Sequence, residues 1–287
     1  MLNIGIIGNT DVLEPHVKRI QKNKNINIIG KASVGTSTQL NSFHFSIPEF
    51  NRVELIERSD LLLIDNSSLL PFGLLRETIK KGKHIFMTEY LPLSEEQCKD
   101  LLKITDESGA VIQVSNPYLY TPAFQWLKNN FSTPFFLDVL KHNNVNDINT
   151  ALFPLLMMLI NITGLHPKRI NAISFKSEKD GSGFSNVRLE FGNASVVNLN
   201  FGSQVPLKSF NIRLYSNDQV VYFNFDKNIF VQNNKDIDMT AHMNVTEFDS
   251  YINLIKNRGQ KTSNFEDYLS AIILAQSIIK KISKFVS

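Results

Sequence analysis

Short, uninterrupted apolar runs separated by helical segments restrict the fold of this chain more than any other feature. Such runs occur at Asn3–Ile7, Leu61–Ile64, His84–Met87 and Ala110–Val114. Continuous apolar runs are typical of parallel strands that are buried on both faces, with helices between them. The alternation predicts an α/β domain of the Rossmann type, a doubly wound parallel sheet, over residues 1–120.

The pattern changes after Pro122. Several later runs alternate apolar and polar residues, which is typical of antiparallel strands with one exposed face. The clearest are Val187–Phe191, Val197–Phe201 and Phe210–Leu214. An apolar helix is expected at Ala151–Ile162, and the spacing of Ser263 and Glu266 predicts the start of a last helix. We therefore expect residues 121–287 to form an α+β domain that contains an open antiparallel sheet.

Composition excludes several classes of partner. The net charge is only +3 and no more than two basic residues are adjacent, so no nucleic-acid footprint is present. The single cysteine, Cys98, has no disulfide partner, and no Cys or His pair shows zinc-ligand spacing. The N-terminus lacks the pattern of a signal peptide, and the apolar stretch Ala151–Ile160 is about half of the ~20 residues that a membrane span needs. These features predict a cytoplasmic protein without a metal, nucleic-acid or membrane partner.

Three local strings carry a family resemblance. Residues 82–94 read GKHIFMTEYLPLS and are similar to the string GKHVLCEKPLALT; residues 113–124 read QVSNPYLYTPAF and are similar to QVGHNRRFNPAF. Residues 247–275 look like a characteristic final helix pair. The strings resemble the Gfo/Idh/MocA family of sugar oxidoreductases. The resemblance implies an NAD or NADP cofactor, a sugar-like small-molecule ligand and a homo-oligomer formed through the C-terminal sheet.

The phosphate loop departs from the family pattern. The family places G-x-G-x-x-G after the first strand, because glycine lets the backbone approach the pyrophosphate. Here the string is Gly8–Leu13, and only its first residue is glycine. Thr10 and Asp11 oppose binding of a dinucleotide; alternatively, one of them caps the helix. Gly8, Asn9 and Thr10 remain the expected loop contacts of any cofactor.

The end of the second strand gives no cofactor preference. The acidic residue that would bind the ribose is missing from Lys31–Ser33. Lys31 would favour a 2′-phosphate, or it is a solvated surface lysine. The sequence therefore does not distinguish NAD from NADP.

The family's acid–base residues are replaced as well. The resemblance places Glu89 at the position of the catalytic lysine, whereas a slip of one residue would place Tyr90 there. The family's D-x-x-x-H motif falls on Thr150 and Pro154, which do not titrate. These replacements disfavour the usual hydride-transfer mechanism.

Polar residues that follow the strands define a candidate pocket. Open α/β sheets bind ligands beyond the carboxyl ends of their strands. Three candidates follow the third apolar strand: Asp65, Asn66 and Ser67. Three candidates for substrate contact lie further along the chain: Asn116, Tyr118 and Tyr120. Alternatively, residues 65–68 form a plain turn with an Asx hydrogen bond.

Two main hypotheses follow. The first is a non-catalytic or chemically diverged binder of a sugar, polyol or nucleotide-linked ligand. The second is an active NAD(P)-dependent oxidoreductase with relocated acid–base groups, for which Glu89, Tyr90 and Tyr118 are the candidates. A third, purely structural hypothesis assigns the apolar sheet face to a dimer or a hetero-complex.

Overall fold

The chain divides into two compact units, each described below by itself. The structure, a computed structural model, describes residues 1–22, 25–32, 47–65, 69–142, 148–164, 166–176, 183–203, 209–239, 246–256 and 265–283. Unit 1 comprises Met1–Ser115 and Thr246–Leu269, and unit 2 comprises Asn116–Val245 and Ser270–Ser287. The sequence led us to expect a single boundary after residue 120. In the structure, Thr246–Leu269 also belongs to unit 1.

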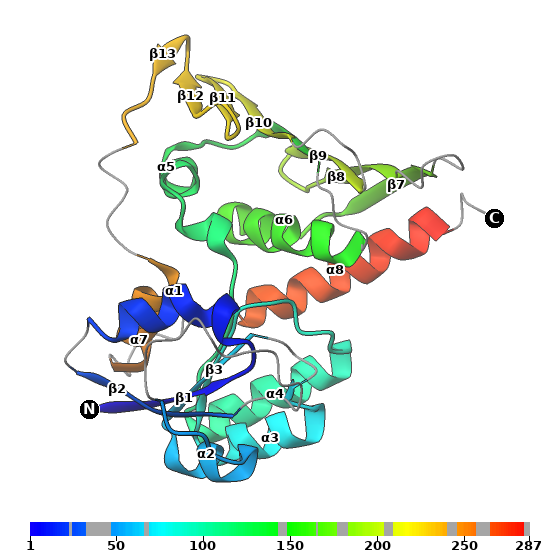
Figure 1. Ribbon diagram of the computed structural model, residues 1–287. Helices are drawn as coiled ribbons and strands as arrows, with labels where there is room; N and C mark the ends of the chain where they lie inside the picture. The colour runs from blue at the N-terminus through cyan, green and yellow to red at the C-terminus, as the bar shows by residue number, and fades with distance from the viewer. Residues whose placement is uncertain are drawn as a thin grey trace. The chain divides into compact units, whose positions relative to one another are not determined.

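A parallel five-stranded sheet forms the centre of unit 1 (Figure 1). Its strands are β1 (Leu2–Ile7), β2 (Ile26–Ala32), β3 (Leu61–Ile64), β4 (His84–Met87) and β5 (Ile112–Val114). Their order is β2-β1-β3-β4-β5, with every pair parallel. The predicted doubly wound sheet is confirmed. Because β1 pairs with both β2 and β3, the winding direction reverses between β1 and β3, which is the switch point of such sheets.

Five described helices belong wholly to unit 1. They are α1 (Thr10–Ile20), α2 (Arg52–Arg58), α3 (Phe72–Lys80), α4 (Glu95–Ser108) and α7 (Glu247–Lys256). A capping box begins α4, since Gln97 N–H donates to Ser94 Oγ at 3.2 Å and Ser94 N–H donates to Gln97 Oε1 at 2.9 Å. The short helix α2 was not expected from the sequence, although Asn51 caps it through Glu54 N–H. Ser263 lies outside the described residues.

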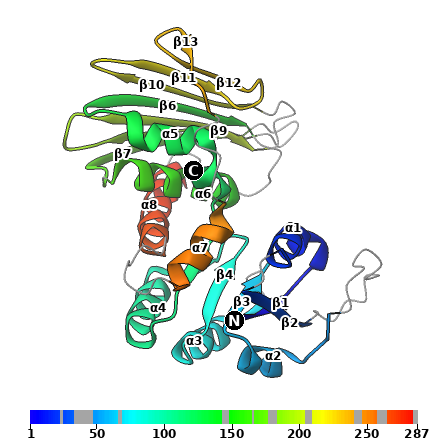
Figure 2. The same ribbon diagram turned by 90° about the vertical axis from the view of Figure 1, so that its left-hand side faces the viewer.

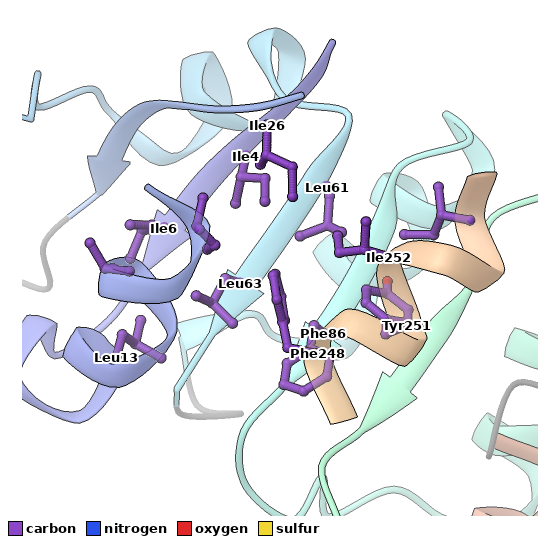
Figure 3. Close-up of a cluster of buried hydrophobic side chains, with 13 residues drawn as sticks. Ile4, Ile6, Leu13, Ile26, Leu61, Leu63, Phe86, Phe248, Tyr251 and Ile252 are labelled. Carbon is purple, nitrogen blue, oxygen red and sulfur yellow. The ribbon is translucent and has the colours of Figure 1, made fainter. Parts of the chain in front are cut away.

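The core on one face of the unit 1 sheet is completed by a helix from the far end of the chain. Figure 3 shows side chains of β1, β3 and α1 beside those of α7. The Phe86 ring lies 5.3 Å, centroid to centroid, from the rings of both Phe248 and Tyr251. Tyr251 O–H also donates to the Val111 carbonyl at 2.9 Å. This packing explains why Thr246–Leu269 belongs to unit 1.

Unit 2 contains an eight-stranded sheet. Its strands are β6 (Phe135–His142), β7 (Arg169–Lys176), β8 (Gly183–Glu190), β9 (Val196–Ser203), β10 (Ser209–Ser216), β11 (Val220–Asn224), β12 (Ile229–Gln232) and β13 (Lys235–Asp236). Their order is β13-β12-β11-β10-β6-β9-β8-β7. The central pair, β6 and β9, is parallel and the other pairs are antiparallel. The predicted α+β domain with an open, largely antiparallel sheet is confirmed, and the parallel pair of β6 and β9 makes the sheet mixed.

The helices of unit 2 lie on one face of this sheet. They are the 3₁₀ helix η2 (Pro117–Tyr120), α5 (Pro122–Asn130), α6 (Ile148–Thr163) and the unit 2 part of α8 (Phe265–Ser283). Figures 1 and 2 both show α5 and α6 against the sheet. Strand β8 alternates accordingly, with Val187 and Leu189 fully buried on the helical side. None of the helices in the described ranges is long and apolar enough to span a membrane.

Candidate functional site

Four strands of the unit 1 sheet end side by side, and the residues that follow them form a row. These residues are Gly8, Asp65, Thr88 and Ser115. The backbone N–H groups of Asp65, Thr88 and Ser115 donate to the last carbonyl of the neighbouring strand at 3.3, 2.9 and 2.7 Å. These bonds extend the parallel ladder by one residue. The row lies at the carboxyl ends of the strands, where open α/β sheets bind ligands.

The Asp65 side chain is directed at the loop between β1 and α1. The residue is only 5% exposed, and its Oδ2 accepts a hydrogen bond from the Asn9 N–H at 2.6 Å. The carboxylate also lies against Gly8, where an added Cβ would come within 1.7 Å of Asp65 Oδ1. Gly8 has a φ of +128°, which side-chain-bearing residues rarely adopt. The one glycine retained in the loop is thus required by the approach of Asp65.

This arrangement does not fit a dinucleotide phosphate. Asn9 is at the N-terminal cap of α1, because its carbonyl accepts the Leu13 N–H at 3.2 Å. In dinucleotide-binding loops the phosphate charge is stabilised at such a helix end. Here the Asp65 carboxylate already supplies that negative charge, and an incoming phosphate would be repelled by it. Strand β2 ends at Ala32 without an acidic residue for a ribose.

Other loop candidates are not placed by the structure. Asn66 and Ser67 lie outside the described residues, as does the side chain of Thr10. The alternative hypothesis, a plain turn at residues 65–68, can therefore be compared with the structure only at Asp65. Its side chain bonds to a residue 56 positions earlier in the chain.

Glu89 adds a second carboxylate near this edge. It follows Thr88, whose Oγ1 donates to the Asp65 carbonyl at 3.3 Å. Partial burial and the charge of Asp65 raise the pKa of Glu89 above its usual value of 4.5. The position that the resemblance assigns to a cationic lysine thus holds an acidic group in an acidic environment.

Tyr90 lies beside a buried phenol. Its ring centroid is 6.2 Å from that of Tyr268, which is 1% exposed. Tyr268 Oη accepts the Leu91 N–H at 3.0 Å and bonds to the Leu91 carbonyl. Burial raises the pKa of Tyr268, so this phenol stays protonated at neutral pH. Tyr268 therefore has a structural role, whereas Tyr90 is only half-buried.

Glu247 is a buried carboxylate that the sequence analysis used only as part of a family string. It is 8% exposed and lies at the start of α7. Its two oxygens accept hydrogen bonds from Ser115 Oγ at 2.6 Å and from Gln113 Nε2 at 3.1 Å. Glu247 thus holds the end of β5 to α7. Nothing in the local sequence signals these bonds, which join residues more than 130 positions apart.

In unit 2, the Asn116 side chain forms hydrogen bonds with backbone groups. It is fully buried; its Nδ2 donates to the Pro154 carbonyl at 3.0 Å, and its Oδ1 accepts the Tyr118 N–H at 3.2 Å. Both bonds stabilise the start of η2 against α6. Pro154 lies within α6, and the side chain of Thr150 is outside the described set. The half-buried Tyr120 ends η2.

Tyr118 belongs to an aromatic cluster that contains a lysine. Its ring centroid lies 6.0 Å from that of Phe124 and 5.2 Å from that of Phe210. Lys141 Nζ lies 4.9 Å from the Tyr118 centroid and 4.0 Å from the Phe210 centroid, within the range of cation–π contact. Lys141 was not among the residues expected from the sequence. A signal was available, because the half-buried Lys141 has the same parity along β6 as the buried Phe135, Leu137 and Val139.

No metal or thiol chemistry is indicated for the part of the chain that the structure describes. That part has no group of three or more His, Cys, Asp or Glu side chains arranged to hold a metal ion. Burial raises the pKa of the Cys98 thiol to about 12, so the reactive thiolate is absent at neutral pH.

Substitution of Gly8 tests the role of Asp65 in the loop. We expect Gly8→Ala to lower the free energy of unfolding by roughly 2 kcal/mol, from the strained φ and the contact with Asp65. Gly73→Ala is the matched control, since nothing lies within 4 Å of its added Cβ in α3. It should be neutral or stabilising. Chemical denaturation of Gly8→Ala with and without Asp65→Ala measures the coupling; strictly additive effects would contradict the contact.

The raised pKa of Glu89 predicts a pH-dependent stability difference. A raised native pKa means that the protonated form is favoured on folding, and this contribution is lost as pH rises through the native value. Glu89→Gln should therefore stabilise the protein at pH 7, and the gain should vanish below the unfolded value of 4.5. Glu96→Gln is the opposite control, because hydrogen bonds from its own backbone and from Ser94 lower the Glu96 pKa. The Tm of each variant is measured at pH 7 and below pH 4.5. A stability gain of Glu89→Gln that persists at the lower pH would contradict the raised pKa of Glu89.

Comparison with solved structures gives full-length matches at low sequence identity. UDP-N-acetylglucosamine 3-dehydrogenase GnnA from Acidithiobacillus ferrooxidans matches with a TM-score of 0.86 at 16% identity, over 100% of this chain and 99% of that one. Biliverdin reductase from Synechocystis sp. PCC 6803, in complex with biliverdin and NADP⁺, gives 0.77 at 13% identity over 98% and 99%. The dehydrogenase MviM from Clostridium difficile gives 0.78 at 14% identity, also over 98% and 99%. No protein-family model and no curated protein matches the chain. The chain has the fold of the Gfo/Idh/MocA-type dehydrogenases.

Proposed function

We propose that this protein binds a sugar, polyol or nucleotide-linked small molecule and does not catalyse the hydride transfer typical of its fold. The observation that carries the proposal is the acidic carboxyl edge of the unit 1 sheet. There the buried Asp65 carboxylate accepts a hydrogen bond from the β1–α1 loop, and Glu89 lies at the position that the resemblance assigns to a cationic lysine. NAD and NADP are not part of the proposed complex.

The charge at Glu89 opposes the chemistry of alcohol oxidation. Oxidation of an alcohol by hydride transfer develops negative charge on the reacting oxygen, which a nearby cation stabilises. A carboxylate in the same place repels that charge. The proximity of Asp65, which raises the Glu89 pKa, strengthens the repulsion.

The second proton-transfer position is also inert. The resemblance places Pro154 where an imidazole would exchange a proton with the substrate hydroxyl. Proline has no titratable side chain, and the Pro154 carbonyl accepts the Asn116 amide in a buried contact. No proton-accepting side chain is therefore supplied from this position.

Two groups at the carboxyl edge of the unit 1 sheet suit a polyhydroxyl ligand. Glu89 is exposed and Thr88 is half-buried, and both offer oxygen atoms to hydroxyl groups. A fold match whose name specifies a sugar nucleotide, UDP-N-acetylglucosamine, adds support for this ligand class.

Paired binding and turnover measurements test the proposal. The purified protein is assayed with NAD⁺ and NADP⁺ against UDP-N-acetylglucosamine, myo-inositol and glucose, and the same compounds are tested for thermal stabilisation. We expect no turnover above background and a saturable rise in Tm with at least one compound class. Saturable NAD(P)-dependent turnover would contradict the proposal.

One alternative has a specific contact in its favour. The Lys141 ammonium lies over the Tyr118 ring, so a phenol and a cation meet within unit 2. An active NAD(P)-dependent oxidoreductase with relocated acid–base groups would use this pair or Tyr90. If turnover is found and Tyr118→Phe abolishes it while Tyr120→Phe does not, this alternative replaces the proposal.

We also propose a homo-oligomer formed through the face of the unit 2 sheet opposite α5 and α6. Ile173 and Phe175 of β7 are 56% and 69% exposed, and Phe184 of β8 is 39% exposed. Phe175 and Phe184 are paired across β7 and β8, so their side chains lie together, and contiguous exposed apolar side chains mark contact surfaces. Sedimentation velocity should show a dimer or larger species that Phe175→Asp weakens. A wild-type monomer at micromolar concentration would exclude this interface.

A further inference from the structure

We infer that the Asp65 carboxylate is an internal anion that occupies the β1–α1 loop and excludes dinucleotide phosphates from it. The inference rests on the proposed function and deepens it. It assigns the lack of cofactor binding to one side chain.

The geometry places the carboxylate where it acts on the loop directly. Asp65 Oδ2 accepts the Asn9 N–H at 2.6 Å, at the N-terminal cap of α1. Hydrogen bonds from backbone N–H groups to a charged acceptor are short and strong, and the dipole of the helix favours a negative charge at this end. In the folded chain, the Asp65 carboxylate therefore already offsets the partial positive charge at the N-terminal end of α1.

The loop is also closed sterically. An added Cβ at Gly8 would meet Asp65 Oδ1 at 1.7 Å, so the carboxylate fills the space that the glycine leaves open. Asp65 is 5% exposed and is buried within this contact. A phosphate could approach Gly8 only if the Asp65 side chain moved away.

A matched carboxylate lies at the opposite end of the same strands. Asp60 Oδ2 accepts the Asn3 N–H at 2.8 Å, just before β3 begins. Asp60 thus accepts a backbone N–H as Asp65 does, but from a residue within β1 and far from the β1–α1 loop. Asp60→Asn therefore controls for the loss of one negative charge and of one carboxylate–backbone bond.

The experiment measures NADH and NADPH binding by titration calorimetry for the wild type, Asp65→Asn, Asp65→Ala and Asp60→Asn. Asp65→Asn removes the charge while keeping the shape, and Asp65→Ala also opens the space. We expect no saturable binding to the wild type or to Asp60→Asn. Both Asp65 variants should bind saturably, with a Kd at least roughly tenfold below the lower limit that the wild-type titration sets, and Asp65→Ala should be the tighter of the two.

Two results would overturn the inference. One is folded Asp65 variants, by circular dichroism, that bind no better than the wild type. The other is Asp60→Asn gaining affinity as much as Asp65→Asn. If the Asp65 variants fail to fold, the wild-type protein is titrated with NADH and the Asn9 amide resonance is followed by NMR. We expect this resonance not to shift. A saturable shift would refute the inference.

These outcomes separate the inference from the proposed function. Variants that gain no affinity refute only the role of Asp65, because the absence of turnover would still stand. Wild-type turnover with either cofactor would refute the proposed function. Variants that bind dinucleotide without turnover support both.

Discussion

The contact between the Asp65 carboxylate and the β1–α1 loop is the constraint on which the candidate site depends. Its oxygen binds the Asn9 N–H at 2.6 Å, and its bulk requires glycine at position 8. Partial burial of Glu89 and the Asp65 charge together raise the Glu89 pKa. Asp65 thus places a buried negative charge at the sheet edge where open α/β sheets bind their ligands.

A second buried carboxylate shows how unit 1 is assembled from distant parts of the chain. Glu247 binds Ser115 and Gln113 at β5, while Tyr251 and Phe248 pack on Phe86 at β4. Together these contacts make α7 part of the unit 1 core. Contacts from both ends of the sequence therefore fix the row of residues at the carboxyl edge: Asn9 binds Asp65, and Glu247 binds Ser115.

Much of the fold could be predicted from the sequence, because the relevant signals are local. Apolar runs located β1, β3, β4 and β5. The parallel pairing of β6 with β9 could not be predicted, since alternation indicates a strand but not its neighbour. The seven-residue helix α2 was missed because it is too short to show a period.

The site was less predictable for the same reason. Glu89 and Pro154 are the residues that the resemblance places at the family's acid–base positions, and that alignment needs only the sequence. The bond between Asp65 and Asn9 spans 56 residues, so neither residue signals it alone. Lys141 contacts Tyr118 and Phe210 only because the sheet and η2 bring them together.

A crystal structure of the wild-type protein grown with NADPH tests the central claim most directly. The account predicts Asp65 Oδ2 within hydrogen-bond distance of the Asn9 N–H and no nucleotide density at the loop. Pyrophosphate resting against Gly8, with the Asp65 side chain rotated away, would contradict it.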